Sequence, residues 1–303
     1  MKLFWLKKLS LIKIFFFNIQ NTLISIIRII IDTKMSLTIK KYPNMGIANS
    51  PNCVLLVNGP SLNIDLKENP WIFNEKNILC VNNFATSELY TQIKPKYYMF
   101  SDPAYWGENP GEFLLNYRSE IFESIKDKTT WDMVLYHPPG ADKIIKEYIN
   151  NNNNKISTYE FNQTAILGFK IFREFCYKNN FGTPPPGNIL IPALINMINL
   201  GYLKIYIAGT DHTMFKNIIV GEDNVLYKEG DHFYGKGKKR KLYSYSYLNG
   251  MVNDQVGLKM SEFLLNAGNV FLSHEIIYEF SKSSNADIIN LTKNSLIDSY
   301  SKK

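Results

Sequence analysis

The sequence predicts an α/β protein with a Rossmann-like, mostly parallel sheet flanked by helices. Short apolar runs recur along the chain and end in turn residues, and helical patterns separate several of them. The 303 residues are 45% hydrophobic and 20% charged, which suits one large globular core and excludes a disordered or collagen-like chain. Uninterrupted apolar runs are typical of strands buried on both faces, as in a parallel sheet.

Six apolar runs are the expected strands of this sheet. They cover residues 53–57, 78–81, 97–100, 133–136, 204–208 and 269–272. Apolar residues at helical spacing predict helices over 165–177, 189–200 and 254–267.

The segments between these elements set the domain boundaries. We expect a linker at 43–52, where Pro43 precedes a polar run, and a Rossmann-like domain over 42–303. The asparagine-rich stretch 150–154 is typical of a surface loop. Polar, aromatic and basic residues over about 213–250 predict an inserted lid.

The charge of the chain is concentrated at its N-terminus. The formal net charge is +7, and residues 1–41 carry eight basic residues against one acid, Asp32, while the remainder holds 26 of each sign. A neutral body excludes a broad nucleic-acid surface. The cysteines, Cys53, Cys80 and Cys176, lie far apart, which excludes a disulfide framework and favours a cytoplasmic protein.

Residues 1–41 are predicted to form a basic, amphipathic arm that associates with a membrane. The longest stretch without a charge, 14–27, has 14 residues, fewer than the ~20 that a spanning helix needs, and no small-residue cleavage site follows. We therefore expect the arm to lie on the anionic inner face of the cell membrane. The alternative is a helix that packs on the domain or on a second protomer of a homo-oligomer.

The ends of the expected strands are the first candidates for a site, because ligands of open α/β sheets bind outside the carboxyl ends of the strands. After the first strand, Gly59 allows a ligand close to the backbone, and Asn58 and Ser61 offer donors and acceptors. The turn matches neither a dinucleotide fingerprint nor a phosphate loop. Asp102 and Asp211, or Asp211 with Asp231, His212 and His232, could also hold a metal, although hydrogen-bonding roles are the commoner use of such residues.

Several motifs in order resemble the small bacterial sialyltransferases that use cytidine-nucleotide sugars. They are Val57–Leu62, Asn82–Phe84, Ser101–Pro103, Asn188 through 200–212, and the ending 290–298. The likeness extends to a wider group with the 6-hydroxymethylpterin diphosphokinase-like domain and the motility-associated-factor proteins implicated in nonulosonic-acid transfer to flagellin. It covers roughly residues 52–298.

This resemblance implies roles for individual residues. The donor-binding residues it implies are Asn58, Gly59, Pro60, Ser61, Asn82, Asn83, Asp102, Asn188 and Thr210. Asp211 matches the acid that ends the later strand. The chain departs from the pattern at several positions: Asp102 replaces an asparagine, Asn83 replaces a glutamine, Asn188 is shifted by one residue from a loop serine, and Thr213 stands where an aromatic residue is expected.

The general base is expected to be His232, in the lid, or His212, beside Asp211. A neutral imidazole titrates near 6.5, close to working pH, so either histidine suits proton removal from an acceptor hydroxyl.

These observations predict an inverting, metal-independent glycosyltransferase without a cofactor. It would move a sialic-acid-like sugar from a CMP-linked donor to a glycan or glycolipid of the bacterial surface, such as lipopolysaccharide or capsule. One alternative is a phosphoryl transferase that uses ATP and Mg²⁺, like the pterin diphosphokinases. Another is a non-catalytic module that binds a glycan or a partner protein, and nucleic acid is not an expected partner.

Overall fold

The computed structural model describes residues 2–32, 51–107, 112–150, 153–213, 215–232, 235–246 and 251–303. Its centre is an eight-stranded sheet of order β13-β12-β6-β1-β2-β3-β4-β5, in which every pairing is parallel. The strands are β1 Asn52–Leu56, β2 Ile78–Val81, β3 Tyr97–Met99, β4 Met133–His137, β5 Ile156–Glu160, β6 Lys204–Ala208, β12 Asp287–Asn290 and β13 Ser301–Lys302. The predicted Rossmann-like α/β class is confirmed.

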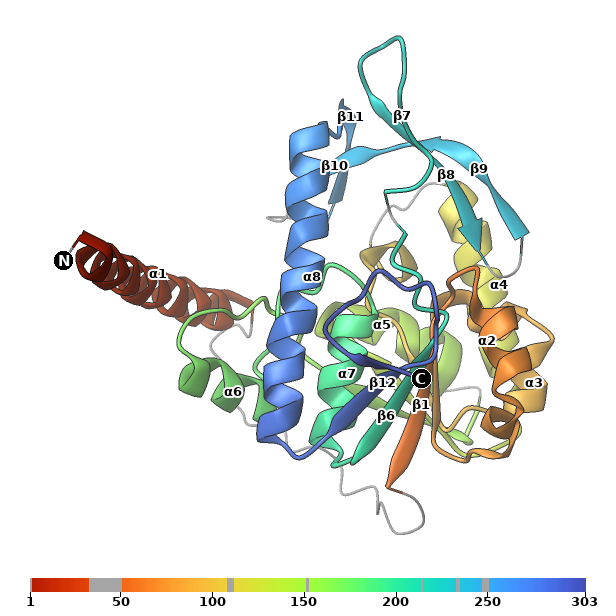
Figure 1. Ribbon diagram of the computed structural model, residues 1–303. Helices are drawn as coiled ribbons and strands as arrows, with labels where there is room; N and C mark the ends of the chain where they lie inside the picture. The colour runs from red at the N-terminus through yellow and green to blue at the C-terminus, as the bar shows by residue number, and fades with distance from the viewer. Residues whose placement is uncertain are drawn as a thin grey trace.

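Helices cover both faces of this sheet (Figure 1). Along β1, Cys53 and Leu55 enter the core on one face, while Val54 and Leu56 enter the core on the other. The first face packs against α6 Lys170–Lys178, α7 Leu190–Asn199 and α8 Met260–Ser283. The second packs against α2 Leu62–Glu68, α3 Leu89–Ile93, α4 Glu112–Lys128 and α5 Asp142–Ile145. Burial on both faces explains why the strands are uninterrupted apolar runs.

The strand order reverses at β1. From β1 the chain adds β2, β3, β4 and β5 towards one edge, and then returns to place β6, β12 and β13 on the other side of β1. The carboxyl ends of β1 and β6 therefore flank the switch point, where open α/β sheets bind ligands.

Five of the six predicted strands are present to within a residue, and the predicted helix at 189–200 is α7. The strand predicted at 269–272 is wrong, because these residues lie inside α8. Buried residues of α8 recur every three or four positions, at Ala267, Val270, His274 and Ile277, which is helical spacing. The sheet instead gains β5, β12 and β13, which are shorter or more polar runs.

Two other predicted helices begin elsewhere. The helix predicted at 254–267 begins only at Met260, since residues 251–257 form β11. The helix predicted at 165–177 is α6, which begins at Lys170.

The region predicted as a lid contains two small antiparallel sheets. One consists of β7 Ile218–Val220, β8 Leu226–His232 and β9 Gly235–Lys241, and the other pairs β10 Tyr243–Ser246 with β11 Met251–Gly257. Both lie on the side of the carboxyl ends of β1 and β6 (Figure 1). Residues 214, 233–234 and 247–250 of this region, like residues 43–50 of the predicted linker, lie outside the described residues.

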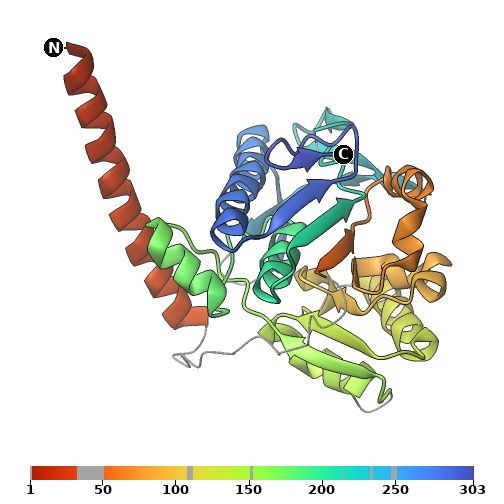
Figure 2. The same cartoon turned by 60° about the horizontal axis from the view of Figure 1, so that its bottom comes forward.

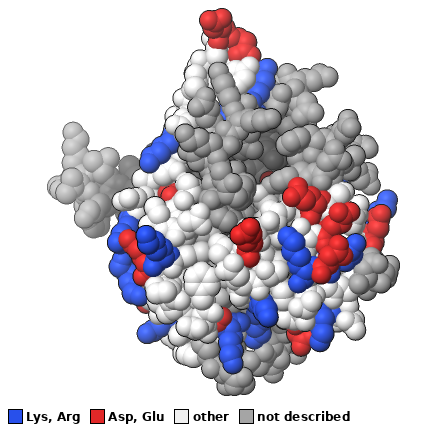
Figure 3. Space-filling view, turned by 90° about the vertical axis from the view of Figure 1, so that its right-hand side faces the viewer, with Lys and Arg blue, Asp and Glu red and all other residues white. Residues whose placement is uncertain are grey.

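The N-terminal helix α1 Lys2–Asp32 projects from the body, with its C-terminal half beside the segment that leads into α6 (Figure 1, Figure 2). Within the described residues, the segment Ile12–Asp32 is long and apolar enough to cross a membrane by length and composition. On the face of the body drawn in Figure 3, acidic and basic side chains are interspersed.

Candidate functional site

Two glycines allow the loops after β1 and β6 to touch at the switch point. The Gly59 amide donates to the Gly209 carbonyl at 3.0 Å. A Cβ on Gly59 would overlap Asp211 Oδ2 and the Gly209 carbonyl, and a Cβ on Gly209, whose φ is +70°, would overlap the Val57 carbonyl. Neither position has room for a side chain, so this close approach requires glycine at both.

Asp211 joins the two loops by accepting hydrogen bonds from Ser61. Asp211 Oδ2 lies 2.8 Å from Ser61 Oγ and 3.2 Å from the Ser61 amide. Ser61 precedes the first residue of α2, so the Asp211 carboxylate lies beside the start of this helix. The structure thus brings together two residues that the sequence predicted for the site.

Asp65 lies beneath this contact and was missed by sequence reasoning. It is 2% exposed, and its Oδ2 accepts hydrogen bonds from the Gly209 amide at 2.8 Å and from Thr292 Oγ1 at 2.5 Å. Burial raises the pKa of Asp65, and these hydrogen bonds offset part of the rise. The sequence did contain a sign that Asp65 is buried. Helical spacing places Asp65 on the same face of α2 as Leu62 and Leu66, and this face packs against the core.

Thr210, predicted to bind the donor, is buried below the surface of the site. It is 1% exposed, and its Oγ1 donates to Asn290 Oδ1 at 2.8 Å. Its carbonyl accepts from Ser295 Oγ at 2.5 Å. Thr210 therefore ties the β6 loop to the loop after β12, and its side chain is hydrogen bonded inside the protein.

Asn58 and Asn82 end the neighbouring strands β1 and β2, and each holds an unused acceptor. Asn58 Nδ2 donates to the Val81 carbonyl at 3.1 Å, which fixes the orientation of its amide. Asn58 Oδ1 and Asn82 Oδ1 are both buried and have no hydrogen-bond partner among the described residues. Buried polar atoms are normally paired, so these two oxygens mark a place where a ligand or water completes the structure.

The backbone at Asn82 is also unusual. Its φ is +52°, and its carbonyl accepts a short hydrogen bond from the Tyr98 hydroxyl. His212, at the end of β6, has a φ of +51°. Left-handed backbone is uncommon outside glycine, although asparagine adopts it more readily than most residues, and five further non-glycine residues in the described part of the chain share it.

The remaining predicted donor-binding residues are spread over the rim. Asn83 is buried, with its Oδ1 accepting from the Tyr105 hydroxyl at 2.9 Å. Asp102, after β3, and Pro60, in the β1 loop, are exposed. The structure thus groups Asn58, Asn82, Ser61 and Asp211 around the switch point, with Asp102 one strand further along the sheet edge.

A chain of hydrogen bonds links Asn188, His212, His274 and Tyr300. Asn188 Nδ2 lies 2.8 Å from His212 Nε2, which lies 3.0 Å from His274 Nε2. His274 Nδ1 lies 2.9 Å from the Tyr300 hydroxyl. His274 is fully buried on α8, and only the structure reveals that it reaches the site.

The tautomer of His212 follows from its neighbours. Asn188 Oδ1 accepts from the amides of Leu190 and Ile191 at the start of α7, so Nδ2 must be the group that faces His212. His212 Nε2 is then an acceptor, and the ring also hydrogen bonds to the Thr210 backbone. Burial lowers the pKa of His212 to about 4, against partial offsets from Asp211 and the Thr210 backbone. His212 is thus neutral near pH 7 and engaged at both ends of its ring.

His232, the other candidate base, is the last residue of β8, where it pairs with Gly235 of β9. Its side chain lies outside the described part of the structure. His137 ends β4, is buried and lies 3.1 Å from the Pro138 carbonyl, which is consistent with a structural role.

Over the described ranges, no three His, Cys, Asp or Glu side chains gather in a metal-binding arrangement. Ser61, Asp65 and Asp211 instead hydrogen bond to each other and to backbone. The fold and this edge define a Rossmann-like α/β protein whose polar side chains converge at the switch point of a parallel sheet.

Comparisons with known proteins show no family for this chain and a distant structural neighbour. No protein-family model matches the chain, and no curated protein does. Among solved structures, the fold is similar to one described as MAf glycosyltransferase from Magnetospirillum magneticum AMB-1, with a TM-score of 0.44 and 11% sequence identity. The match covers 84% of this chain and 34% of that chain, so this chain spans about a third of that protein's length.

Proposed function

We propose that the protein is a glycosyltransferase that binds a nucleotide-activated sugar at the carboxyl edge of the sheet. The observation that carries this proposal is the pair of unpartnered amide oxygens, Asn58 Oδ1 and Asn82 Oδ1, at neighbouring strand ends beside the switch point. The motif order of the sequence, with its resemblance to sialyltransferases, supports a CMP-linked, sialic-acid-like donor.

The orientation of Asn58 restricts what it binds. Because its Nδ2 is used by the Val81 carbonyl, only Oδ1 is left for a ligand, and an amide oxygen accepts hydrogen bonds. It therefore suits a hydroxyl of the ribose or the sugar, or an amino group of the base. A phosphate, which has acceptor oxygens, suits Asn82 Nδ2 instead, because both donors of Ser61 are used by the Asp211 carboxylate.

We propose direct displacement with inversion. The acceptor oxygen forms a bond to the anomeric carbon while the bond from that carbon to the phosphate oxygen breaks, and the nucleotide leaves as its phosphate. The proton of the acceptor hydroxyl passes to a general base, for which we propose His232 on β8. His212 is the weaker candidate, because its Nε2 faces Asn188 and His274 and burial lowers its pKa to about 4.

Transfer assays with matched histidine variants test this proposal. The full chain is incubated with CMP-linked sialic acid and an array of glycan and glycolipid acceptors, and products are detected by mass spectrometry. His232→Gln should lower the rate by about 10²- to 10⁴-fold while leaving CMP binding intact. His212→Asn, which tolerates left-handed backbone, should lower it less. Full activity of His232→Gln would refute the assignment of the base, and absence of transfer from CMP-linked sialic acid would refute the proposed donor.

A further inference from the structure

The helix α1 turns polar side chains towards the body of the protein and leaves large apolar side chains exposed. Polar side chains on the face towards the body pair with the segment 164–169. Thr22 Oγ1 accepts from the Phe169 amide at 3.2 Å, and Ser25 Oγ both donates to the Leu167 carbonyl at 3.1 Å and accepts from the Leu167 amide at 2.9 Å. Asp32 Oδ2 accepts from Thr164 Oγ1 at 2.7 Å.

These contacts recur at helical spacing and run along one face of the helix. Thr22, Ser25, Ile29 and Asp32 are three or four residues apart, and Ile29 enters the main core. Gly168, with a φ of +115°, has no room for a Cβ because Thr22 lies against it. The C-terminal half of α1 is therefore docked on the body by specific contacts.

The opposite face of α1 is apolar and exposed. Ile27 is 56% exposed and Ile31 is 67% exposed. The same side of the helix carries further large apolar residues, each at least 40% exposed: Ile12, Phe16, Leu23 and Ile30. Lys13 and Gln20 are exposed polar residues on this side, and the apolar side chains around them form a surface large enough to mark an interaction site on a folded protein.

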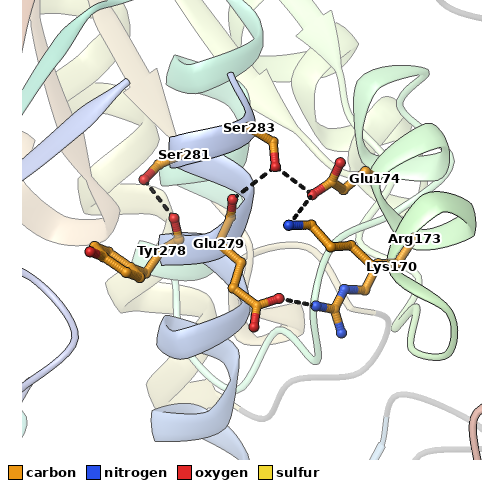
Figure 4. A network of polar contacts seen from close by, with 7 residues as sticks. All are labelled: Lys170, Arg173, Glu174, Tyr278, Glu279, Ser281 and Ser283. Atoms are coloured by element: carbon orange, nitrogen blue, oxygen red, sulfur yellow. Dashed lines mark hydrogen bonds and ion pairs between the residues drawn. The ribbon is translucent and has the colours of Figure 1, made fainter. Parts of the chain in front are cut away.

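The segment 164–169, on which α1 docks, is held in place by the helix that follows it. It leads into α6, which is joined to α8 by Arg173 and Glu279 and by the hydrogen bond from Ser283 Oγ to Glu174 Oε1 at 2.8 Å (Figure 4). The apolar face of α1 is thus fixed relative to the domain.

We propose that this face binds the surface of an anionic bilayer, with α1 lying in the plane of the membrane. Residues 1–41 carry a net charge of +7, which complements anionic lipid headgroups. A second copy of the arm would bring the same positive charge, so self-pairing is disfavoured. A helix that crossed the bilayer would have to use the segment Ile12–Asp32. Crossing is disfavoured because the C-terminal half of this segment is docked on the body. The N-terminal half of the helix also carries four charges, at Lys2, Lys7, Lys8 and Lys13.

Flotation of the full chain with lipid vesicles tests the surface. We expect binding to vesicles containing phosphatidylglycerol and far less to phosphatidylcholine alone. Ile27→Gln/Ile31→Gln should lower the partition coefficient by at least about tenfold. The matched control Leu203→Gln/Leu296→Gln, at residues 51% and 47% exposed on the body, should leave it unchanged.

Labelling of sealed vesicles tests the in-plane orientation. The three native cysteines are buried, so the Lys2→Cys variant adds a single thiol at the N-terminal end of α1 that an impermeant maleimide can report on. Added from outside, the reagent should label this introduced thiol fully when the chain is bound. Protection of the introduced thiol, equal binding to both vesicle types, or equal binding of the Ile27→Gln/Ile31→Gln variant would each overturn the proposal. So would an α1-mediated dimer that does not bind lipid.

Discussion

The side-chain amide of Asn188 lies 2.8 Å from His212 Nε2, while the oxygen of the same amide accepts from the first amides of α7. One asparagine therefore fixes the start of a helix and the tautomer of a histidine at the end of β6. His274 touches the same ring nitrogen from α8, so three elements meet at His212.

This arrangement predicts a loss of stability in mild acid. Burial lowers the pKa of His212 from 6.5 to about 4 and lowers that of His274 as well. The unfolded chain takes up these protons near pH 6.5, so the stabilisation is complete above pH 6.5 and is lost as the pH falls towards 4. For His212 alone the loss is about 3 kcal/mol.

Urea unfolding at several values between pH 7 and 4 measures this dependence. The raised pKa of Asp65 acts in the opposite direction, so the comparison with His212→Asn isolates the contribution of the histidine. The free energy of unfolding of that variant should fall less steeply over this window. Identical slopes for the two proteins would contradict the burial of a neutral His212.

The loop contact at the switch point predicts that alanine substitution at two glycines changes the stability of the fold in opposite directions. Gly59→Ala would place a Cβ against Asp211 and the Gly209 carbonyl, and we expect a loss of about 1–3 kcal/mol. Gly268→Ala, inside α8, meets nothing within 4 Å and should stabilise the fold by about 0.5–1 kcal/mol. Thermal unfolding of both variants checks the contrast, and a tolerated Gly59→Ala would show that the loops are not in close contact.

Asp65 is predicted to be structural. Asp65→Ala would leave the Gly209 amide and the Thr292 hydroxyl buried without an acceptor, at a cost of about 1–3 kcal/mol for each. Asp65→Asn retains one acceptor oxygen and should lose less. Denaturant unfolding of the two variants gives the difference, and equal losses would show that these hydrogen bonds contribute little.

Asn82 is predicted to contact the bound nucleotide. Asn82→Asp keeps the shape of the side chain and tolerates the left-handed backbone, but it adds a negative charge beside the proposed phosphate. We expect CMP affinity to fall at least tenfold, by about 1.4 kcal/mol or more, with little change in melting temperature. Asn179→Asp, at a distant asparagine just after α6, is the matched control. Calorimetric titration distinguishes the two, and unchanged affinity in Asn82→Asp would place the nucleotide elsewhere.

The main sheet was predictable because its strands carry a simple signal. The apolar runs at β1, β2, β3, β4 and β6 end in turn residues, and burial on both faces requires such runs. The run at 269–272 has the same composition but belongs to α8, because a short apolar run does not distinguish a strand from a buried stretch of helix.

The site was predictable only in part. Asn58, Ser61, Asn82 and Asp211 lie in the short loops that follow their strands, so their places at one sheet edge follow from parallel topology. Asp65 and His274 reach the same region from within helices, and such placement depends on how each helix rotates against the core. The polar docking face of α1 could not be recognised from the sequence, because its partner, the segment 164–169, lies far away along the chain.

We propose that the carboxyl edge of the sheet binds a cytidine nucleotide sugar. Calorimetric titration of the full chain with CMP, CDP, UDP, GDP and ATP, each in EDTA and in Mg²⁺, measures this binding. Selective binding of CMP or CDP in EDTA, weakened by Asn82→Asp, is the predicted result. Binding of ATP only with Mg²⁺ would contradict the account and favour phosphoryl transfer, and binding of no nucleotide would favour a non-catalytic module.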